Sequence, residues 1–186
     1  MPNENKFHTE GKFQTFAEAE YRNLEGKLHT VSATFTPVAD GEKNYVEVEV
    51  GERPLRLVSD PNGSGAFFAR VYEDDGGIYD VDDTGTELTP EPINRADQSY
   101  SLDSNLAFEK NPTVTDPGTE IIEEYSAGSA GKNDAKPSTP GVVTPRTRMI
   151  LAPNTKYLFE IEDATTDTDN DTYGIIMNFW ETKFDF

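Results

Sequence analysis

From residue 27 onward, apolar and polar residues alternate in short runs that are separated by turn residues. The clearest run is 45–50, where three valines at alternate positions share one face and two glutamates share the other. Alternation with a period of two residues is typical of a β-strand with one buried face. Further strand-length segments cover 27–36, 55–58, 66–72, 100–110 and 118–125. Strands spaced about eight to twelve residues apart, with turn signals between them, predict an all-β fold, an antiparallel β-sandwich of jelly-roll-like form.

Residues 147–186 contain the densest apolar positions and the only tryptophan of the chain. Pro153 and Asn154 predict a turn, because proline presets φ and asparagine tolerates left-handed geometry. We expect three strands here, forming a meander that closes an antiparallel sheet. In the last strand, the residues expected to face the core are Tyr173, Ile175, Met177 and Phe179. Trp180 has the opposite parity, and both a contact with a neighbouring molecule and a place in the core remain open for it.

A polar N-terminal arm, residues 1–26, precedes a single β-sandwich domain, residues 27–186. Thr15 and Glu18 form a weak capping box, and the residues after them can form two helical turns before Gly26, with a disordered terminus as the alternative. The arm also carries four aromatic residues, Phe7, Phe13, Phe16 and Tyr21. Aromatic residues in a polar tail are typical of anchors that become buried on binding. We therefore expect the arm to be open to proteases until a partner covers it.

Two long polar segments and a strong negative charge complete the organisation of the chain. Residues 73–99 are acidic, and residues 126–146, rich in Gly, Ser, Ala and Pro, predict a flexible surface loop. The 186 residues have a formal net charge of −19 and include no cysteine. This charge disfavours nucleic acid and anionic membranes as partners, since both select clustered Lys and Arg. No apolar run approaches the length of a membrane span.

The residue types needed for common catalytic sites are scarce. The only histidines are His8 and His29. Together with the lack of cysteine, this disfavours zinc sites and nucleophilic triads that depend on histidine or thiolate. The segment 128–132 lacks the glycine spacing of a phosphate-binding loop. We therefore expect no enzymatic activity and assign no catalytic residue.

One acidic loop has the ligand spacing of a calcium loop. The candidate ligands, which occupy positions one, three, five and twelve of that loop, are Asp80, Asp82, Thr84 and Glu91. Gly85 stands at position six, as the pattern requires, but Glu87 stands where an apolar residue is usual and no helices are expected on either side. Calcium or another divalent cation is thus the one cofactor that the sequence suggests, with a solvated hairpin loop as the alternative.

Several segments, taken in order, resemble a group of tailed-phage virion proteins. The matching segments are Val48–Leu57, Thr86–Pro90, Asn94-Arg95, Asn111–Thr119, Arg148–Leu158 and Phe179–Glu181. That group shares a Pro-Thr-x-x-x-x-Gly-Thr segment, a Gly-rich loop, a Leu-x-Pro-Asn-Thr-x-Tyr-Leu hairpin and an aromatic closing strand. This chain departs from the pattern at Ala96, where a second asparagine is usual, and it continues past Trp180 to Phe186.

The resemblance implies a capsid decoration, or cement, protein with a β-sandwich fold. Such a protein is expected to bind the major capsid protein on the outer surface of an icosahedral capsid and to stabilise it, after synthesis in the host cytoplasm. A homotrimer would match the local three-fold positions of such a shell. The candidate contact residues are the four arm aromatics together with Trp180, Phe184 and Phe186. A carbohydrate- or receptor-binding module of a virion spike or adhesin remains the alternative, because sandwiches serve both roles.

Overall fold

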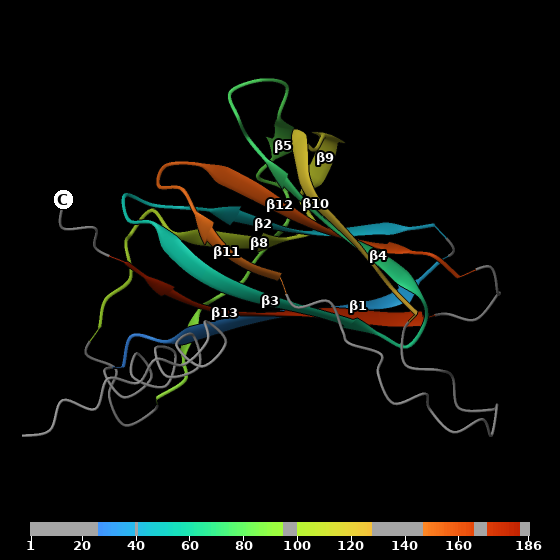
Figure 1. Cartoon of the computed structure of the whole chain (residues 1–186), viewed down its shortest axis with the longest axis horizontal. Helices are drawn as coiled ribbons and strands as arrows, with labels where there is room; N and C mark the ends of the chain where they lie inside the picture. The colour runs from blue at the N-terminus through green and yellow to red at the C-terminus, as the bar shows by residue number, and fades with distance from the viewer. Residues whose placement is uncertain (1–25, 40, 95–99, 128–146, 166–170, 183–186) are drawn as a thin grey trace, which may run out of the picture.

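The computed structural model of the chain describes residues 26–39, 41–94, 100–127, 147–165 and 171–182, and these residues form three antiparallel sheets without a helix (Figure 1). The five-stranded sheet has the order β11 (Thr147–Leu151), β3 (Leu55–Gly63), β13 (Asp171–Glu181), β1 (His29–Val38) and β7 (Glu91–Pro92). The six-stranded sheet has the order β10 (Thr119–Ser126), β4 (Phe67–Glu73), β12 (Lys156–Asp163), β2 (Lys43–Glu49), β8 (Ala107–Lys110) and β6 (Thr86–Glu87). The two-stranded sheet pairs β5 (Asp80–Asp82) with β9 (Thr113–Asp116). The predicted all-β antiparallel fold is confirmed, and its jelly-roll form stays a prediction.

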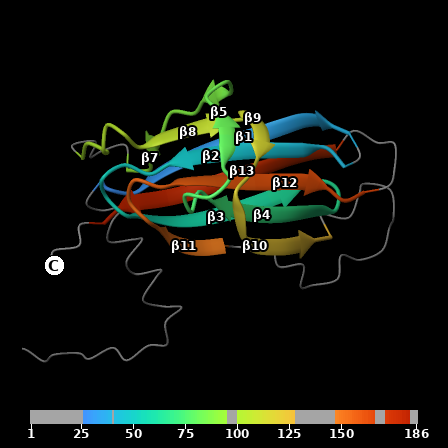
Figure 2. The ribbon, with the colours of Figure 1, turned by 90° about the horizontal axis from the view of Figure 1, so that it is seen from above.

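The two large sheets pack face to face, and the small sheet lies on the outer side of the six-stranded one (Figures 1 and 2). The core fills the space between the large sheets, where apolar side chains from alternate positions of both are buried. The residues that the sequence pattern places inside, and that are buried there, include Val31, Phe35, Val46, Val48, Val50, Tyr173, Ile175, Met177 and Phe179. The alternation therefore predicts the inward faces of β1, β2 and β13 correctly.

The expected three-strand meander in the C-terminal stretch is wrong. β11 pairs with β3, β12 lies between β2 and β4 in the other sheet, and β13 returns to the first sheet between β1 and β3. The physical reason is visible in β12, where Tyr157, Leu158 and Phe159 are all buried although successive residues point to opposite faces. A strand that is buried on both faces takes a central position in its sheet. β12 takes such a position between β4 and β2, and β13 takes one between β3 and β1 in the other sheet.

The turn predicted at Pro153 and Asn154 is confirmed, and it carries the chain from one sheet to the other. Asn154 has a φ of 54°, in the left-handed region that asparagine tolerates better than most residues. The amide of Asn154 donates to the carbonyl of Gly51 at 2.9 Å, and the amide of Val50 donates to the carbonyl of Thr155 at 3.0 Å. The turn is therefore fixed against the loop that follows β2.

Candidate functional site

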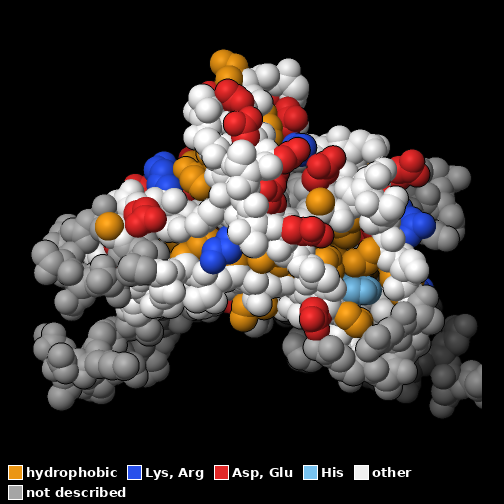
Figure 3. All heavy atoms as spheres, turned by 180° about the vertical axis from the view of Figure 1, so that it is seen from behind, with side chains coloured by type: hydrophobic (Ala, Val, Ile, Leu, Met, Phe, Trp, Pro, Cys, Tyr) orange, Lys and Arg blue, Asp and Glu red, His pale blue; other side chains and the backbone are white. Residues whose placement is uncertain are grey.

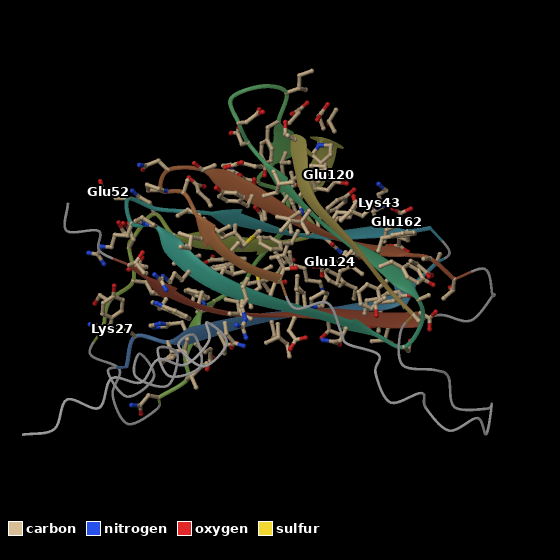
Figure 4. All side chains as sticks on the ribbon, viewed as in Figure 1. Lys27, Lys43, Glu52, Glu120, Glu124 and Glu162 are labelled. Atoms are coloured by element: carbon tan, nitrogen blue, oxygen red, sulfur yellow. The ribbon has the colours of Figure 1, made fainter. Side chains whose placement is uncertain are left out.

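The outer face of the six-stranded sheet carries a connected group of charged side chains centred on Glu160. Its neighbours in β12 face the core, so Glu160 faces outward, yet it is only 1% exposed. Arg70 Nη1 lies 2.6 Å from Oε1 of Glu160, and Lys43 Nζ lies 3.2 Å from Oε2. Two cations thus flank the buried carboxylate, and Figure 4 shows Lys43, Glu162 and Glu120 gathered over the same part of the sheet.

Arg70 connects this group to the edge of the sheet. Besides Glu160 it contacts Glu162 and, at 2.6 Å from its Nε, Glu123 of β10. Burial lowers the pKa of Arg70, but hydrogen bonds to its carboxylate partners outweigh this and raise the pKa above its ordinary value. The guanidinium stays charged at any physiological pH. Arg70 therefore joins three strands, β4, β12 and β10, by charge-assisted hydrogen bonds.

Two tyrosines border the same carboxylate. Burial, reinforced by the negative charge of Glu160, raises the pKa values of Tyr45 and Tyr72 above their ordinary value. The Tyr72 hydroxyl donates to Oε1 of Glu160 at 3.4 Å. These hydroxyls remain protonated donors, so they suit a structural role better than that of a base.

A second acidic group, the acidic cluster, consists of Glu47 on β2, Glu109 on β8 and Asp83, the residue that follows β5. One carboxylate oxygen from each of these residues lies within 4.8 Å of the others, and this is the one such group among the residues that the structure describes. Lys156 Nζ lies 3.4 Å from Glu47 and 3.5 Å from Asp83. Carboxylate oxygens suit a hard cation such as calcium, but the ammonium group of Lys156 already supplies positive charge to the cluster.

Glu47 is the buried member of the acidic cluster, at 3% exposure. The Tyr79 hydroxyl from the loop before β5 donates to its Oε1 at 2.8 Å. Burial raises the pKa of the Glu47 carboxyl, while the bonds from Tyr79 and Lys156 oppose the shift. Alternation predicts correctly that Glu47 faces outward, but it cannot show that a third layer covers this face. The direct cross-strand pairing of Glu47 with Glu109 is likewise a property of the sheet, and it leaves no signal in the local sequence.

The structure does not bring together the carboxylates of the predicted calcium loop. Asp80 and Asp82 lie on β5, and Thr84 follows them, with its hydroxyl 2.7 Å from that of Thr113. Glu91 lies on β7 of the five-stranded sheet, opposite Thr30 of β1. The loop instead contributes Asp83, the residue directly after β5, to the acidic cluster.

Trp180 lies on the outer face of the five-stranded sheet, away from the core, and is nevertheless buried, with 2% of its surface exposed. Its indole Nε1 is buried and has no hydrogen-bond partner among the residues that the structure describes. A groove of about 210 Å³ opens beside it, lined by Arg56, Leu57, Val58, Arg148, Met149, Ile150 and Trp180. Trp180 thus lies outside the core cluster between the sheets, and its contact with a neighbouring molecule stays a prediction.

Glu181, the neighbour of Trp180, ties a long loop to the end of the sandwich. Its Oε2 accepts hydrogen bonds from Arg53 and from the Tyr100 hydroxyl, both at 2.9 Å. Its Oε1 accepts a bond of 2.7 Å from the amide of Asp103. Glu181 thus fixes the segment that leads into β8. The sequence shows only a polar residue at the end of an apolar strand and does not predict these partners.

Exposed apolar side chains mark two neighbouring edges of the sandwich. Figure 2 shows β10 and β11, the edge strands of the two large sheets, one after the other along the same side of the sandwich. Ile121 and Tyr125 on β10 are 42% and 60% exposed, and Ile150 on β11 is 56% exposed. The Tyr125 ring packs on Phe68 with a centroid distance of 5.3 Å. This edge is the part of the described surface best suited to protein contact.

Six further residues were predicted to make contacts, and all of them lie outside the described residues: Phe7, Phe13, Phe16, Tyr21, Phe184 and Phe186. Most of the loop expected at 126–146 also lies outside them.

Compared with protein-family models, with curated proteins and with solved structures, the chain matches none. Among the described residues, no helix is long and apolar enough to cross a membrane. The function is therefore argued from the residues of the chain itself.

Proposed function

We propose that the chain is a structural, non-enzymatic virion protein that binds the outer surface of an icosahedral capsid and stabilises it. The observation that carries this proposal is the edge formed by β10 and β11, where Ile121, Tyr125 and Ile150 are exposed on the terminal strands of the two large sheets, as the described residues form them. Apolar side chains and open strand edges are features of surfaces that bind other proteins.

The place of the resembling segments in the fold agrees with this proposal. Leu151 and Leu158 of the Leu-x-Pro-Asn-Thr-x-Tyr-Leu hairpin are buried, on strands of opposite sheets. The Tyr157 hydroxyl accepts a hydrogen bond from the amide of Ala152 and donates one of 2.7 Å to Glu73. These residues determine the fold, and the fold they build is the sandwich that the resemblance implies.

The charge distribution bears on the partner. Acidic side chains gather over the small sheet, and basic ones are few on the face shown in Figure 3. The major capsid protein that this chain meets should accordingly offer a basic or cation-bridged surface. A homotrimer would engage several capsid subunits at once, and linked contacts gain affinity through effective concentration.

Binding to undecorated capsids tests the proposal. We expect the purified protein to be a trimer, to bind capsids that lack it and to raise their resistance to heat. Ile121→Asp with Tyr125→Asp should abolish binding, whereas Ile78→Asp, at a 74% exposed site on the loop before β5, should not. A wild-type protein that fails to bind such capsids at any salt concentration would contradict the proposal.

One observation favours the alternative, a carbohydrate-binding module. The exposed ring of Tyr125 packs on the half-buried ring of Phe68, and Glu162 stands opposite Phe68 on the neighbouring strand. Aromatic faces next to carboxylates suit sugar rings, which offer both apolar faces and hydroxyl donors. Specific signals on a glycan array that are lost in Tyr125→Ala would move this function to first place.

A further inference from the structure

Four carboxylates are buried among the residues that the structure describes, and one of them differs from the rest. Each of Glu47, Glu160 and Glu181 lies 3.4 Å or less from a Lys or Arg nitrogen. The fourth, Asp163 at the end of β12, is 3% exposed and forms no ion pair with a Lys or Arg of the described residues. A buried carboxylate without a compensating charge is strongly destabilising. Asp163 therefore needs positive charge that the described part of the chain does not provide.

The two oxygens of Asp163 have different surroundings. The amide and the hydroxyl of Thr165 donate to Oδ1 at 2.7 and 2.8 Å, and the Tyr173 hydroxyl donates to the same atom at 2.8 Å. Oδ2 is also buried, and it has no hydrogen-bond partner among the described residues. Buried polar atoms are nearly always satisfied, so an unsatisfied one indicates a missing partner. For a carboxylate oxygen, that partner can be a hard cation.

A second carboxylate lies beside Asp163. Oδ2 of Asp171, the first residue of β13, is 3.4 Å from both the Tyr173 and the Thr165 hydroxyl, which are the two hydroxyls that donate to Asp163. Each hydroxyl has one proton, and the shorter bonds are those to Asp163. Burial, reinforced by a hydrogen bond to Asp163 and by the charges of both carboxylates, raises the pKa of Tyr173 above its ordinary value. Two negative groups thus share one small polar site with too few protons for their oxygens.

The loop between β3 and β4 forms the third side of this site. The Ser64 hydroxyl donates to Oδ1 of Asp171 at 2.6 Å, and the Tyr173 hydroxyl lies 3.1 Å from the carbonyl of Ala66. Gly65 approaches so closely that a Cβ at this position would overlap Oδ2 of Asp171. Strand β12 belongs to the six-stranded sheet and β13 to the five-stranded one, so both sheets meet here, at the right-hand end of the sandwich in Figure 1.

We propose that Asp163 and Asp171 bind one calcium ion at this end of the sandwich through their Oδ2 atoms. Calcium takes six to eight oxygen ligands in irregular geometry, and water completes the set that the carboxylates begin. Sites with few charged ligands belong to the weak class, so we expect a dissociation constant of about 0.1–1 mM. The ion links β12 to β13 and thereby holds the two large sheets together. The inference does not depend on the proposed capsid function.

This site is distinct from the other two acidic groups of the chain. The predicted calcium loop has its carboxylates on β5 and β7, in different sheets. The acidic cluster already receives positive charge from Lys156, which contacts Glu47 and Asp83. Asp163 and Asp171 have no such partner within the described residues, and a variant of the acidic cluster is therefore a suitable control.

Thermal unfolding of the full-length protein tests the proposal. Calcium chloride at 10 mM should raise the Tm by roughly 3 °C or more above its value in sodium chloride of equal ionic strength. The sodium reference is necessary because any salt screens a net charge of −19. Asp163→Asn and Asp171→Asn should each abolish the difference between the two salts. Asp83→Asn, in the acidic cluster, should retain it.

Terbium luminescence provides an independent measurement on the folded protein. Terbium(III) replaces calcium at oxygen sites and emits when a neighbouring tyrosine is excited, and the Tyr173 hydroxyl touches both carboxylates. We expect terbium emission that calcium displaces at millimolar concentration and that Asp171→Asn reduces severalfold, which keeps the test decisive if Asp163→Asn does not fold. Equal Tm values of the wild type in the two salts would overturn the proposal. So would a calcium response that Asp171→Asn retains and Asp83→Asn loses, because that result would assign the ion to the acidic cluster.

Discussion

At the scale of single residues, the structure is organised around carboxylates that face outward and are nonetheless buried. Glu160 and Glu47 both stand on the outer face of the six-stranded sheet, and each meets a cation and a tyrosine hydroxyl. Burying a carboxylate without partners costs several kcal/mol, so the partners determine whether the strand tolerates it. Alternation predicts which way these side chains point. It does not predict their burial, because the covering residues come from distant strands and from a third layer.

Glu160 should therefore matter far more than its partially exposed counterpart. Glu160→Gln removes the buried one of the two carboxylates that both Arg70 and Lys43 approach, and we expect it to lower the free energy of unfolding by about 3 kcal/mol. Glu123→Gln removes another partner of Arg70, one whose side chain is 48% exposed, and should cost less than about 1 kcal/mol. Urea denaturation of both variants checks this. Equal losses would show that the charged group acts as a surface network.

At the scale of elements, strands are easier to predict than the sheet to which each belongs. The runs at 45–50 and 66–72 and the last strand follow from local alternation, and the structure places strands at each. The meander fails because β11, β12 and β13 alternate between two sheets, and sheet membership depends on which distant strand each one meets. The acidic cluster shows the same limit. Asp83 lies in the loop that the sequence marks as a cation site, but its partners Glu47 and Glu109 are brought there by strand pairing.

The turn between β11 and β12 offers a test of this connection. Asn154→Ala places a residue that disfavours positive φ at 54°, and we expect it to reduce the free energy of unfolding by roughly 1 kcal/mol. Asn154→Gly should be neutral within a few tenths of a kcal/mol, because glycine adopts this geometry without strain. Thermal or urea denaturation of the two variants measures this difference in the free energy of unfolding. Similar losses in both would mean that the asparagine side chain, and not the backbone conformation, stabilises the turn.

At the scale of the whole molecule, buried and half-buried tyrosines are distributed over both large sheets and the segments beside them. Burial is the main cause that raises the pKa above 10 for Tyr45, Tyr72, Tyr79, Tyr100, Tyr157 and Tyr173. For Tyr157 the pKa rises to about 12. Hydrogen bonds to carboxylates reinforce the shift at several of these residues. The folded chain therefore retains protons that the unfolded chain releases.

Stability should fall steeply in alkali. Below pH about 9 these tyrosines are protonated in both states and do not affect unfolding, whereas above pH 10 only the unfolded state ionises freely. Each tyrosine then lowers the free energy of unfolding by up to ~1.4 kcal/mol per pH unit until the pH reaches its raised pKa. Urea denaturation at several alkaline pH values measures how steeply the free energy of unfolding falls with pH. Tyr173→Phe should reduce this slope by the contribution of one ionising group. Phenol absorbance that titrates near pH 10 while the circular dichroism stays native would contradict this account.

The position of β13 also governs how the chain reaches its native state. This strand lies between β1 and β3 at the centre of the five-stranded sheet, and His29 pairs with Phe179 at the opposite end of the described sequence. During synthesis, β1 and β3 emerge early and must wait, unpaired along those edges, until the last strand leaves the ribosome. Closing such distant pairs carries a large loop-entropy cost, so folding of this sheet is expected to be slow. A chain interrupted before β13 has no central strand for this sheet, and it would present open edges that favour degradation or aggregation over assembly.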